Sequence, residues 1–130
     1  MISNQILQKT VDGLHQITKI DFAVLDTEGS VLATTFADAK SYSETASDFS
    51  DSPVDNQVAH GCHFFKVSEE GRVEYIIMVN GDGEDAATIG KVATFQIEEL
   101  LIAYRERFDK DNFIKNLLLD NLLLVDIYNR

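Results

Sequence analysis

The segment that decides the fold is RVEYIIMVN, from Arg72 to Asn80. Side chains alternate between the two faces of a β-strand, and both faces of this segment carry apolar groups. One face presents Val73, Tyr75, Ile77 and Val79. The other presents Glu74, Ile76, Met78 and Asn80. A strand with apolar groups on both faces is buried on both, so we predict that it lies in the centre of a sheet.

Two β-hairpins are predicted around this strand. Residues 63–68 precede it, and Glu69-Glu70-Gly71 forms the connecting turn. Farther upstream, residues 22–26 and 31–35 are short β-prone runs joined by a turn with the sequence TEGS. Between the hairpins, residues 36–60 are polar and contain the only proline, so we expect short helical turns there and no long element.

Helices are predicted before and after the strands. Ser3 is a suitable N-cap, and Ile2 and Leu7 have the spacing of a hydrophobic staple. Residues 3–17 therefore read as an amphipathic helix with the apolar face Ile6, Leu7, Val11, Leu14 and Ile17. A second helix is expected to begin with Asp85 as its cap and to run to about Phe108. Its expected apolar side consists of Ile89, Val92, Ala93, Gln96, Leu100, Ala103 and Tyr104.

The C-terminal run FIKNLLLDNLLLVDIYNR, from Phe113 to Arg130, is helical in pattern and carries no C-terminal capping signal. We therefore expect a piece of a longer protein, with residues 1–108 as one domain and residues 109–130 as a helical connector. A 4-3-4-3 spacing predicts a seam that pairs two copies into a homodimer, with a central Asn fixing the register. That seam comprises Ile114, Leu118, Asn121, Val125 and Tyr128. The long helix before it is an alternative dimer interface, and packing within one chain is an alternative to the dimer. The pattern also leaves open whether this helix continues the one before it.

The same C-terminal block carries a family resemblance. FDKDNFIKNLLLDNLLLVDIYNR, from Phe108 to Arg130, resembles the segment that follows the N-terminal sensory domain of carbohydrate-diacid-regulator and PucR-like bacterial transcription factors. The segments ISNQILQKTVDGLHQIT, HFFKV and GDGEDAATIGKVATFQIEELL resemble a clostridial branch of that group. The resemblance implies a sensory domain that leads to later domains, including a DNA-binding helix-turn-helix.

The resemblance has one departure. Members that sense sugar diacids carry Arg-x-Gly and His-x-x-Ala motifs after the second strand. Residues 33–55, ATTFADAKSYSETASDFSDSPVD, contain neither Arg nor His, so a diacid ligand does not carry over. The order of predicted elements is that of PAS-like and GAF-like sensors, an α+β fold with an antiparallel sheet, helices on one side of it and a long C-terminal helical segment.

The composition of the chain argues against several classes of function. The chain of 130 residues carries 22 acidic and 11 basic side chains, a net charge of −11, which repels nucleic acid and anionic membranes. The single Cys62 fits a reducing compartment, and no apolar run reaches the length of about 20 residues that spans a bilayer. We expect a cytoplasmic domain that binds neither nucleic acid nor membrane by itself.

The densest group of reactive side chains is His60-Gly61-Cys62-His63. Strand alternation places His60 and Cys62 on one face and His63 on the other, a poor arrangement for three ligands of one metal. The sequence also lacks a recognisable set of nucleophile, base and orienting group. We therefore expect no enzyme, no catalytic residue, no metal and no cofactor.

A small-molecule pocket is expected between the sheet and the polar stretch 36–60, because such coverings commonly leave a cavity. The candidate ligand-binding residues are Thr34, His63, Lys66, Arg72 and Tyr75. They cannot all face one cavity, since His63 and Lys66 alternate along their strand. The alternative is a filled core with these groups at its rim, which would make the domain a ligand-free module for dimerisation or interaction.

Overall fold

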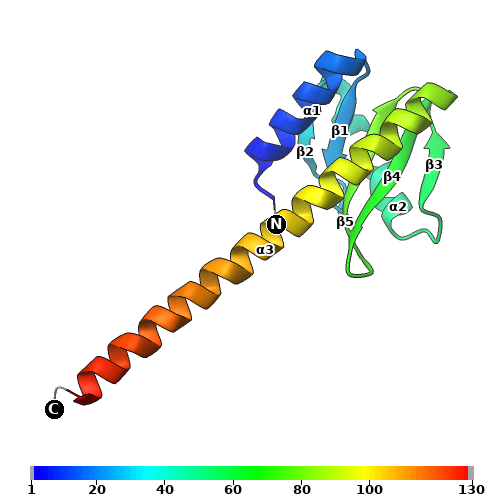
Figure 1. The fold of residues 1–130 in the computed structure, drawn as a ribbon. Coiled ribbons are helices and arrows are strands. Elements are labelled where there is room, and N and C mark those ends of the chain that lie inside the picture. Colours follow the sequence, from blue (N-terminus) through cyan, green and yellow to red (C-terminus); the bar gives the residue numbers. More distant parts are fainter. Residues whose placement is uncertain (1, 129–130) are drawn as a thin grey trace.

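The computed structural model describes the backbone of residues 2–128, and the side chains of residues 2–110 and 113–115. The chain is an α+β protein built on a five-stranded antiparallel sheet (Figure 1). The elements in chain order are α1 (Asn4–Thr18), β1 (Phe22–Leu25), β2 (Val31–Thr34), the 3-10 helix η1 (Ala37–Tyr42), α2 (Ser43–Ser50), β3 (Asn56–Ala59), β4 (Cys62–Glu69), β5 (Arg72–Asn80) and α3 (Glu84–Tyr128).

The sheet has the strand order β2-β1-β5-β4-β3, so the segment Arg72–Asn80 is its central strand, as predicted. Both predicted hairpins are present, and β3 adds an edge strand within the polar stretch where none was expected. A β-bulge interrupts the pairing of β4 with β5, since Val67 lies opposite Tyr75 while Ser68 lies opposite Val73. The extra residue, Glu74, shifts the alternation, and Val73 consequently packs on the face opposite Tyr75.

Helices α1 and α3 cover one face of the sheet, α1 over β1 and β2, and α3 over β4 and β5 (Figure 1). The core on this face joins Val11 of α1 and Ile97 of α3 to Phe22, Phe65 and Ile77 of the strands. Burial of these side chains supplies most of the hydrophobic stabilisation that fixes both helices on the sheet.

The second face is covered as well, which corrects the expectation of helices on one side only. Ala39 of η1, together with Ala46 and Phe49 of α2, packs against Phe64 and Met78 of the sheet. The space between the polar stretch and the sheet is therefore filled by side chains, and the cavity expected there is replaced by a second core. A few small or aromatic groups in a Ser- and Asp-rich segment were enough to hold it on the sheet.

Helix α1 begins as predicted, because the Ser3 hydroxyl accepts a hydrogen bond from the Ile6 amide and the staple residues Ile2 and Leu7 are both buried. Its predicted apolar face is wrong at one end. Ile17 is 82% exposed, because the helix ends at Thr18 beyond the edge of the core that it covers.

Helix α3 begins at Glu84, so Asp85 lies in its first turn and is not the cap. Its buried stripe runs through Ala86, Ala93, Ile97 and Leu101, whereas Val92, Gln96 and Ala103, which were expected to be buried, face solvent. The helix is continuous to Tyr128 and extends well beyond the sheet (Figure 1). The predicted domain boundary at residue 108 falls within it.

Of the predicted dimer seam, only Ile114 has a described side chain, and it is 44% exposed. The side chains of Leu118, Asn121, Val125 and Tyr128 lie outside the described residues. The seam therefore stays a prediction.

Candidate functional site

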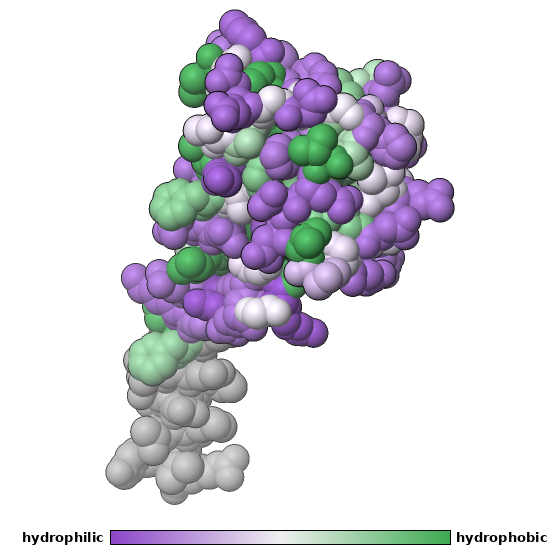
Figure 2. Space-filling model, turned by 90° about the vertical axis from the view of Figure 1, so that its right-hand side faces the viewer, coloured by the Kyte–Doolittle hydropathy of each residue, from purple (hydrophilic) through white to green (hydrophobic). Residues whose placement is uncertain are grey.

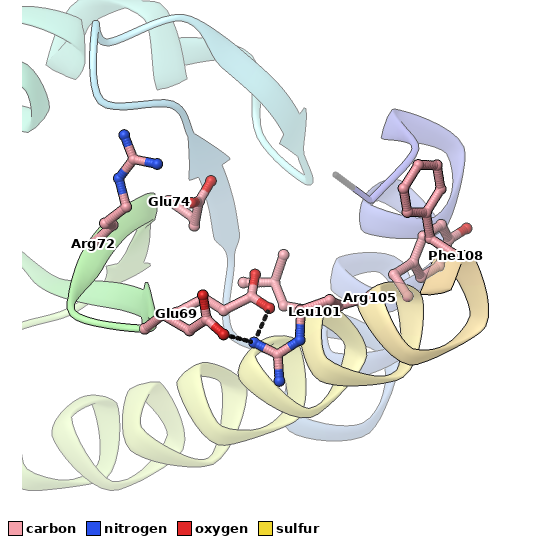
Figure 3. A pocket seen from close by; sticks show the side chains of 8 residues that line it. Glu69, Arg72, Glu74, Leu101, Arg105 and Phe108 are labelled. Atoms are coloured by element: carbon pink, nitrogen blue, oxygen red, sulfur yellow. Dashed lines mark hydrogen bonds and ion pairs between the residues drawn. The ribbon is translucent and has the colours of Figure 1, made fainter. Parts of the chain in front are cut away.

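A pocket of about 470 Å³ lies where α3 passes the tip of the β4–β5 hairpin (Figure 3). The strands and their turn contribute Glu69, Glu70, Arg72 and Glu74, and α3 contributes Leu101, Tyr104, Arg105 and Phe108. The volume is within the range of small-molecule sites, which is roughly 300–1,000 Å³. The pocket thus joins the hairpin to the helix that leaves the sheet.

An ion-pair cluster closes one side of this pocket. Arg105 Nη1 lies 2.9 Å from Glu69 Oε1 and 2.8 Å from Glu70 Oε1 (Figure 3). Glu70 is largely exposed, while the Glu69 side chain is only 18% exposed. Glu69 Oε1 is shielded from solvent and has no well-aligned hydrogen-bond donor among the described residues, so its contact with Arg105 is electrostatic.

The rest of the lining combines charged and apolar groups. Arg72 is exposed and Glu74 half-buried, and among the described residues neither forms an ion pair within 4.0 Å. Both lie on the far side of the Glu69–Arg105 pair from α3 (Figure 3). Of the apolar lining residues on α3, Leu101 is buried and Phe108 is 65% exposed. The pocket therefore presents a free cation, a free anion and an apolar wall.

Of the predicted ligand-binding residues, Arg72 lines this pocket and Tyr75 does not. The Tyr75 ring is fully buried on the helix face of the sheet, and its hydroxyl oxygen accepts a hydrogen bond of 3.2 Å from the Ile2 amide. Burial raises the pKa of the Tyr75 hydroxyl above its usual 10.0. Tyr75 therefore ties the N-terminal segment to the central strand.

The other three predicted residues lie in separate places. Lys66 is on the α2 side, where Nζ donates to the Ser52 carbonyl and lies 5.1 Å from the centre of the Phe49 ring. Thr34 is at the outer edge of β2, where its backbone amide and carbonyl both bond to the Gln8 side chain. That amide side chain continues the hydrogen bonding of an edge strand, which is a structural role.

His63 is on the opposite face of β4 from Lys66, as strand alternation predicted. Its ring stacks on Phe65, with 4.6 Å between the ring centroids, and the residue is only 8% exposed. Its Nδ1 has no hydrogen-bond partner among the described residues. Burial, with a smaller contribution from Lys91, lowers the pKa of His63 below its usual 6.5. The neutral imidazole is thus a packed member of the interface between β4 and α3.

The group at residues 60–63 is divided by the strand. Cys62 is buried on the α2 face, whereas His63 is on the α3 face. His60 is exposed in the turn and lines a shallow polar pocket of about 270 Å³ with Ser41, Tyr42 and Thr45. Within the described part of the chain, no group of three or more His, Cys, Asp or Glu side chains is placed to hold a metal ion.

Of the pocket's eight lining residues, sequence reasoning named only Arg72 as a ligand-binding candidate and missed the other seven. Glu69 and Glu70 were assigned only to the turn, and Phe108 only to the end of the helix. The sequence does contain a signal for this site: an acidic hairpin turn, and an Arg near the end of the buried stripe of the helix. This signal predicts an ion pair only once it is known that α3 crosses the hairpin at that turn.

Comparisons with protein-family models, with curated proteins and with solved structures give no match to this chain. The geometry of the pocket and of α3 therefore carries the functional argument. Within the described residues, no helix has the combination of length and apolar character that a membrane crossing requires.

Proposed function

We propose that this chain is a sensory domain of a bacterial transcription regulator, with a PAS-like or GAF-like fold, and that it binds a small cytoplasmic molecule. The family resemblance of residues 108–130 supports the regulator, and the helix-covered antiparallel sheet supports the fold. In this role the domain performs no catalysis, and DNA is bound by a later domain of the longer protein.

One observation carries the proposal: the pocket is shared by the β4–β5 hairpin and by α3, the helix that extends beyond the sheet (Figures 1 and 3). A ligand there contacts the rigid sheet and the output helix together. Any difference in its affinity between two positions of α3 becomes a shift in the populations of those positions. In a homodimer, that shift would change how the two C-terminal helices pair.

The cluster around Arg105 is suited to such coupling. Arg105 is the α3 group that bonds to both Glu69 and Glu70 across the pocket edge. The Arg105–Glu70 pair is exposed, and an exposed ion pair contributes little energy, about 1 kcal/mol or less. A ligand that supplies its own charge can therefore rearrange that pair at small cost, which is what a responsive contact requires.

The experiment is thermal melting of the chain against a panel of sugar acids, dicarboxylates, purine breakdown products and amino acids. A ligand at about 100 times its dissociation constant adds roughly 2.7 kcal/mol, which raises Tm by several degrees. The matched variants are Phe108→Ser, which removes part of the pocket wall, and Phe95→Ser. Phe95 is equally exposed on the same helix, 63% against 65%, but lies outside the pocket.

The proposal expects a saturable rise in Tm with at least one panel member, weakened in Phe108→Ser and retained in Phe95→Ser. A flat response across the panel, or a rise that Phe108→Ser leaves unchanged, contradicts ligand sensing at this pocket.

A second candidate function is a ligand-free module for dimerisation. It is favoured by the apolar groups Ile17, Val92 and Phe95, which are more than half exposed along α1 and α3. A shallow groove of about 360 Å³ lies between these helices. On the face shown in Figure 2, by contrast, apolar side chains form isolated patches among hydrophilic ones. Sedimentation of wild type and Phe95→Ser separates the candidates, because a module of this kind loses its dimer in the variant.

A further inference from the structure

The charges in the pocket between α3 and the β4–β5 hairpin are unevenly compensated. Glu69, Glu70 and Glu74 outnumber Arg72 and Arg105. Arg105 is already bonded to two of these carboxylates. A ligand with a net negative charge would therefore meet an excess of carboxylates, in a chain whose own net charge is −11.

Arg72 and Glu74 are the charged lining groups left without an ion-pair partner among the described residues. They are two residues apart on the same strand, β5. Arg72 is paired with Glu69 on β4, and Glu74 is the extra residue of the β-bulge. Both side chains line the same pocket, so a molecule bound there meets a free guanidinium and a free carboxylate together.

The third component is the apolar wall on α3. The pocket is lined on this side by Leu101, which is 3% exposed, by the half-buried Tyr104 and by the exposed Phe108. One turn of helix separates each of these residues from the next, so the three form a continuous surface. An aliphatic or aromatic group placed against them would be removed from water.

We propose that this pocket binds a small zwitterion with an apolar side group, of the α-amino acid class. Its carboxylate pairs with Arg72, its ammonium group pairs with Glu74, and its side chain lies against Leu101, Tyr104 and Phe108. A guanidinium binds a carboxylate through two parallel hydrogen bonds, and a carboxylate accepts from an ammonium group, so both contacts are charge-assisted. This assignment rests on the proposed sensory function and specifies the ligand.

The competing ligand classes fit less well. A dicarboxylate satisfies Arg72 but places its second charge beside Glu70 or Glu74. A simple amine satisfies Glu74 but leaves Arg72 beside a second cation. A neutral apolar molecule covers the wall while burying part of both charges without a partner, which costs free energy.

The test is calorimetric titration of the chain with leucine and phenylalanine, each compared with two derivatives. N-acetyl-leucine lacks the ammonium group and leucinamide lacks the carboxylate. The variants are Arg72→Gln and Glu74→Gln, with Arg107→Gln and Glu44→Gln as matched controls at exposed positions outside the pocket. Succinate serves as the dianionic probe.

We expect leucine or phenylalanine to bind saturably, and each pocket variant to weaken binding about tenfold to hundredfold while the controls leave it unchanged. N-acetyl-leucine should bind more weakly than leucine by a similar factor, and its affinity should not change in Glu74→Gln. Leucinamide should be insensitive to Arg72→Gln. Binding of succinate or another panel compound, lost in Phe108→Ser while the amino acids fail to bind, overturns the zwitterion but leaves the sensory proposal standing. No binding by any compound overturns both.

Discussion

Gly90 of α3 lies directly against the ring of Phe65 on β4. A Cβ atom added at Gly90 would come within 2.6 Å of Phe65 Cζ and 2.8 Å of Cδ2, closer than van der Waals contact allows. This glycine is in mid-helix, where glycine is unfavourable, and the reason is the close approach of helix and strand. The same approach buries His63, which stacks on Phe65. The Gly90–Phe65 contact therefore anchors the domain end of the helix that extends beyond the sheet.

Gly90→Ala is expected to destabilise the chain despite the better helix propensity of alanine. Overpacking costs about 1–3 kcal/mol, against a propensity gain of roughly 1 kcal/mol, so we expect a net loss of up to about 2 kcal/mol in urea unfolding. The matched control is Gly13→Ala in α1, where an added Cβ has no neighbour within 4 Å. That variant should gain about 0.5–1 kcal/mol.

A double-mutant cycle checks the cause. In a Phe65→Leu background, Gly90→Ala should cost less than it does in the wild type, because the smaller side chain leaves room for the methyl group. An equal cost in both backgrounds would show that the penalty does not arise from this contact.

Tyr75→Phe is expected to lower the free energy of unfolding by about 1–2 kcal/mol, because the buried Ile2 amide loses its acceptor. The control is Tyr104→Phe, whose hydroxyl enters no side-chain hydrogen bond with the described residues. Hydrogen exchange at Ile2 should quicken in the first variant and stay the same in the second. Equal stability of Tyr75→Phe and the wild type would contradict the role assigned to the hydroxyl.

Stability should fall on acidification because of His63. Burial lowers the pKa of this group in the folded state, so the unfolded chain binds a proton that the folded chain resists. The stabilisation is complete above about pH 6.5 and is lost progressively as the pH falls from there towards the folded-state pKa. In His63→Phe, Tm should decline less between about pH 7.5 and pH 5.5 than in wild type. His60→Asn, at an exposed position, should follow the wild type; a parallel decline in His63→Phe would refute the assignment.

Arg105→Gln should lower stability by about 1 kcal/mol, because Arg105 and Glu70 are both more than one-third exposed and water screens their attraction, while the less exposed Glu69 also loses its charge partner. The difference from wild type should shrink as salt is added. Arg107→Gln, an exposed neighbour on α3, is the control for loss of one positive charge. A loss above about 2 kcal/mol that salt does not change would mean that the cluster is a rigid structural element.

The elements that the sequence predicts well are those decided locally. The Ser3 cap, the two hairpins and the central position of Arg72–Asn80 all follow from short-range patterns, and the structure confirms them. Strand β3 was missed because its residues, Asn56–Ala59, form a half-exposed edge without a strong apolar pattern. The bulge at Glu74, which moves Val73 to the other face, depends on the pairing with β4 and is invisible in one strand alone.

The candidate site was predictable only in part for the same reason. Arg72 was named because it is a polar side chain on a predicted strand that could face a pocket. Its pocket neighbours on α3 lie about thirty residues away in sequence, and only the packing of Ile97 and Leu101 on the sheet brings that helical turn to the hairpin. Tyr75 was named as a polar group facing a cavity, but its hydroxyl meets the Ile2 amide, a contact between residues 73 positions apart.

The central claim is that one ligand, bound beside the β4–β5 hairpin, contacts α3 as well and changes its environment. The most direct measurement is the two-dimensional ¹H–¹⁵N spectrum of the chain, recorded during titration with the compound panel, leucine and phenylalanine included. The account predicts that amides of residues 69–74 and 101–108 shift together and saturate at one ligand concentration, in wild type and in Phe95→Ser but not in Phe108→Ser. Saturable shifts confined to other regions, such as residues 41–60, or no saturable shift with any compound, would contradict it.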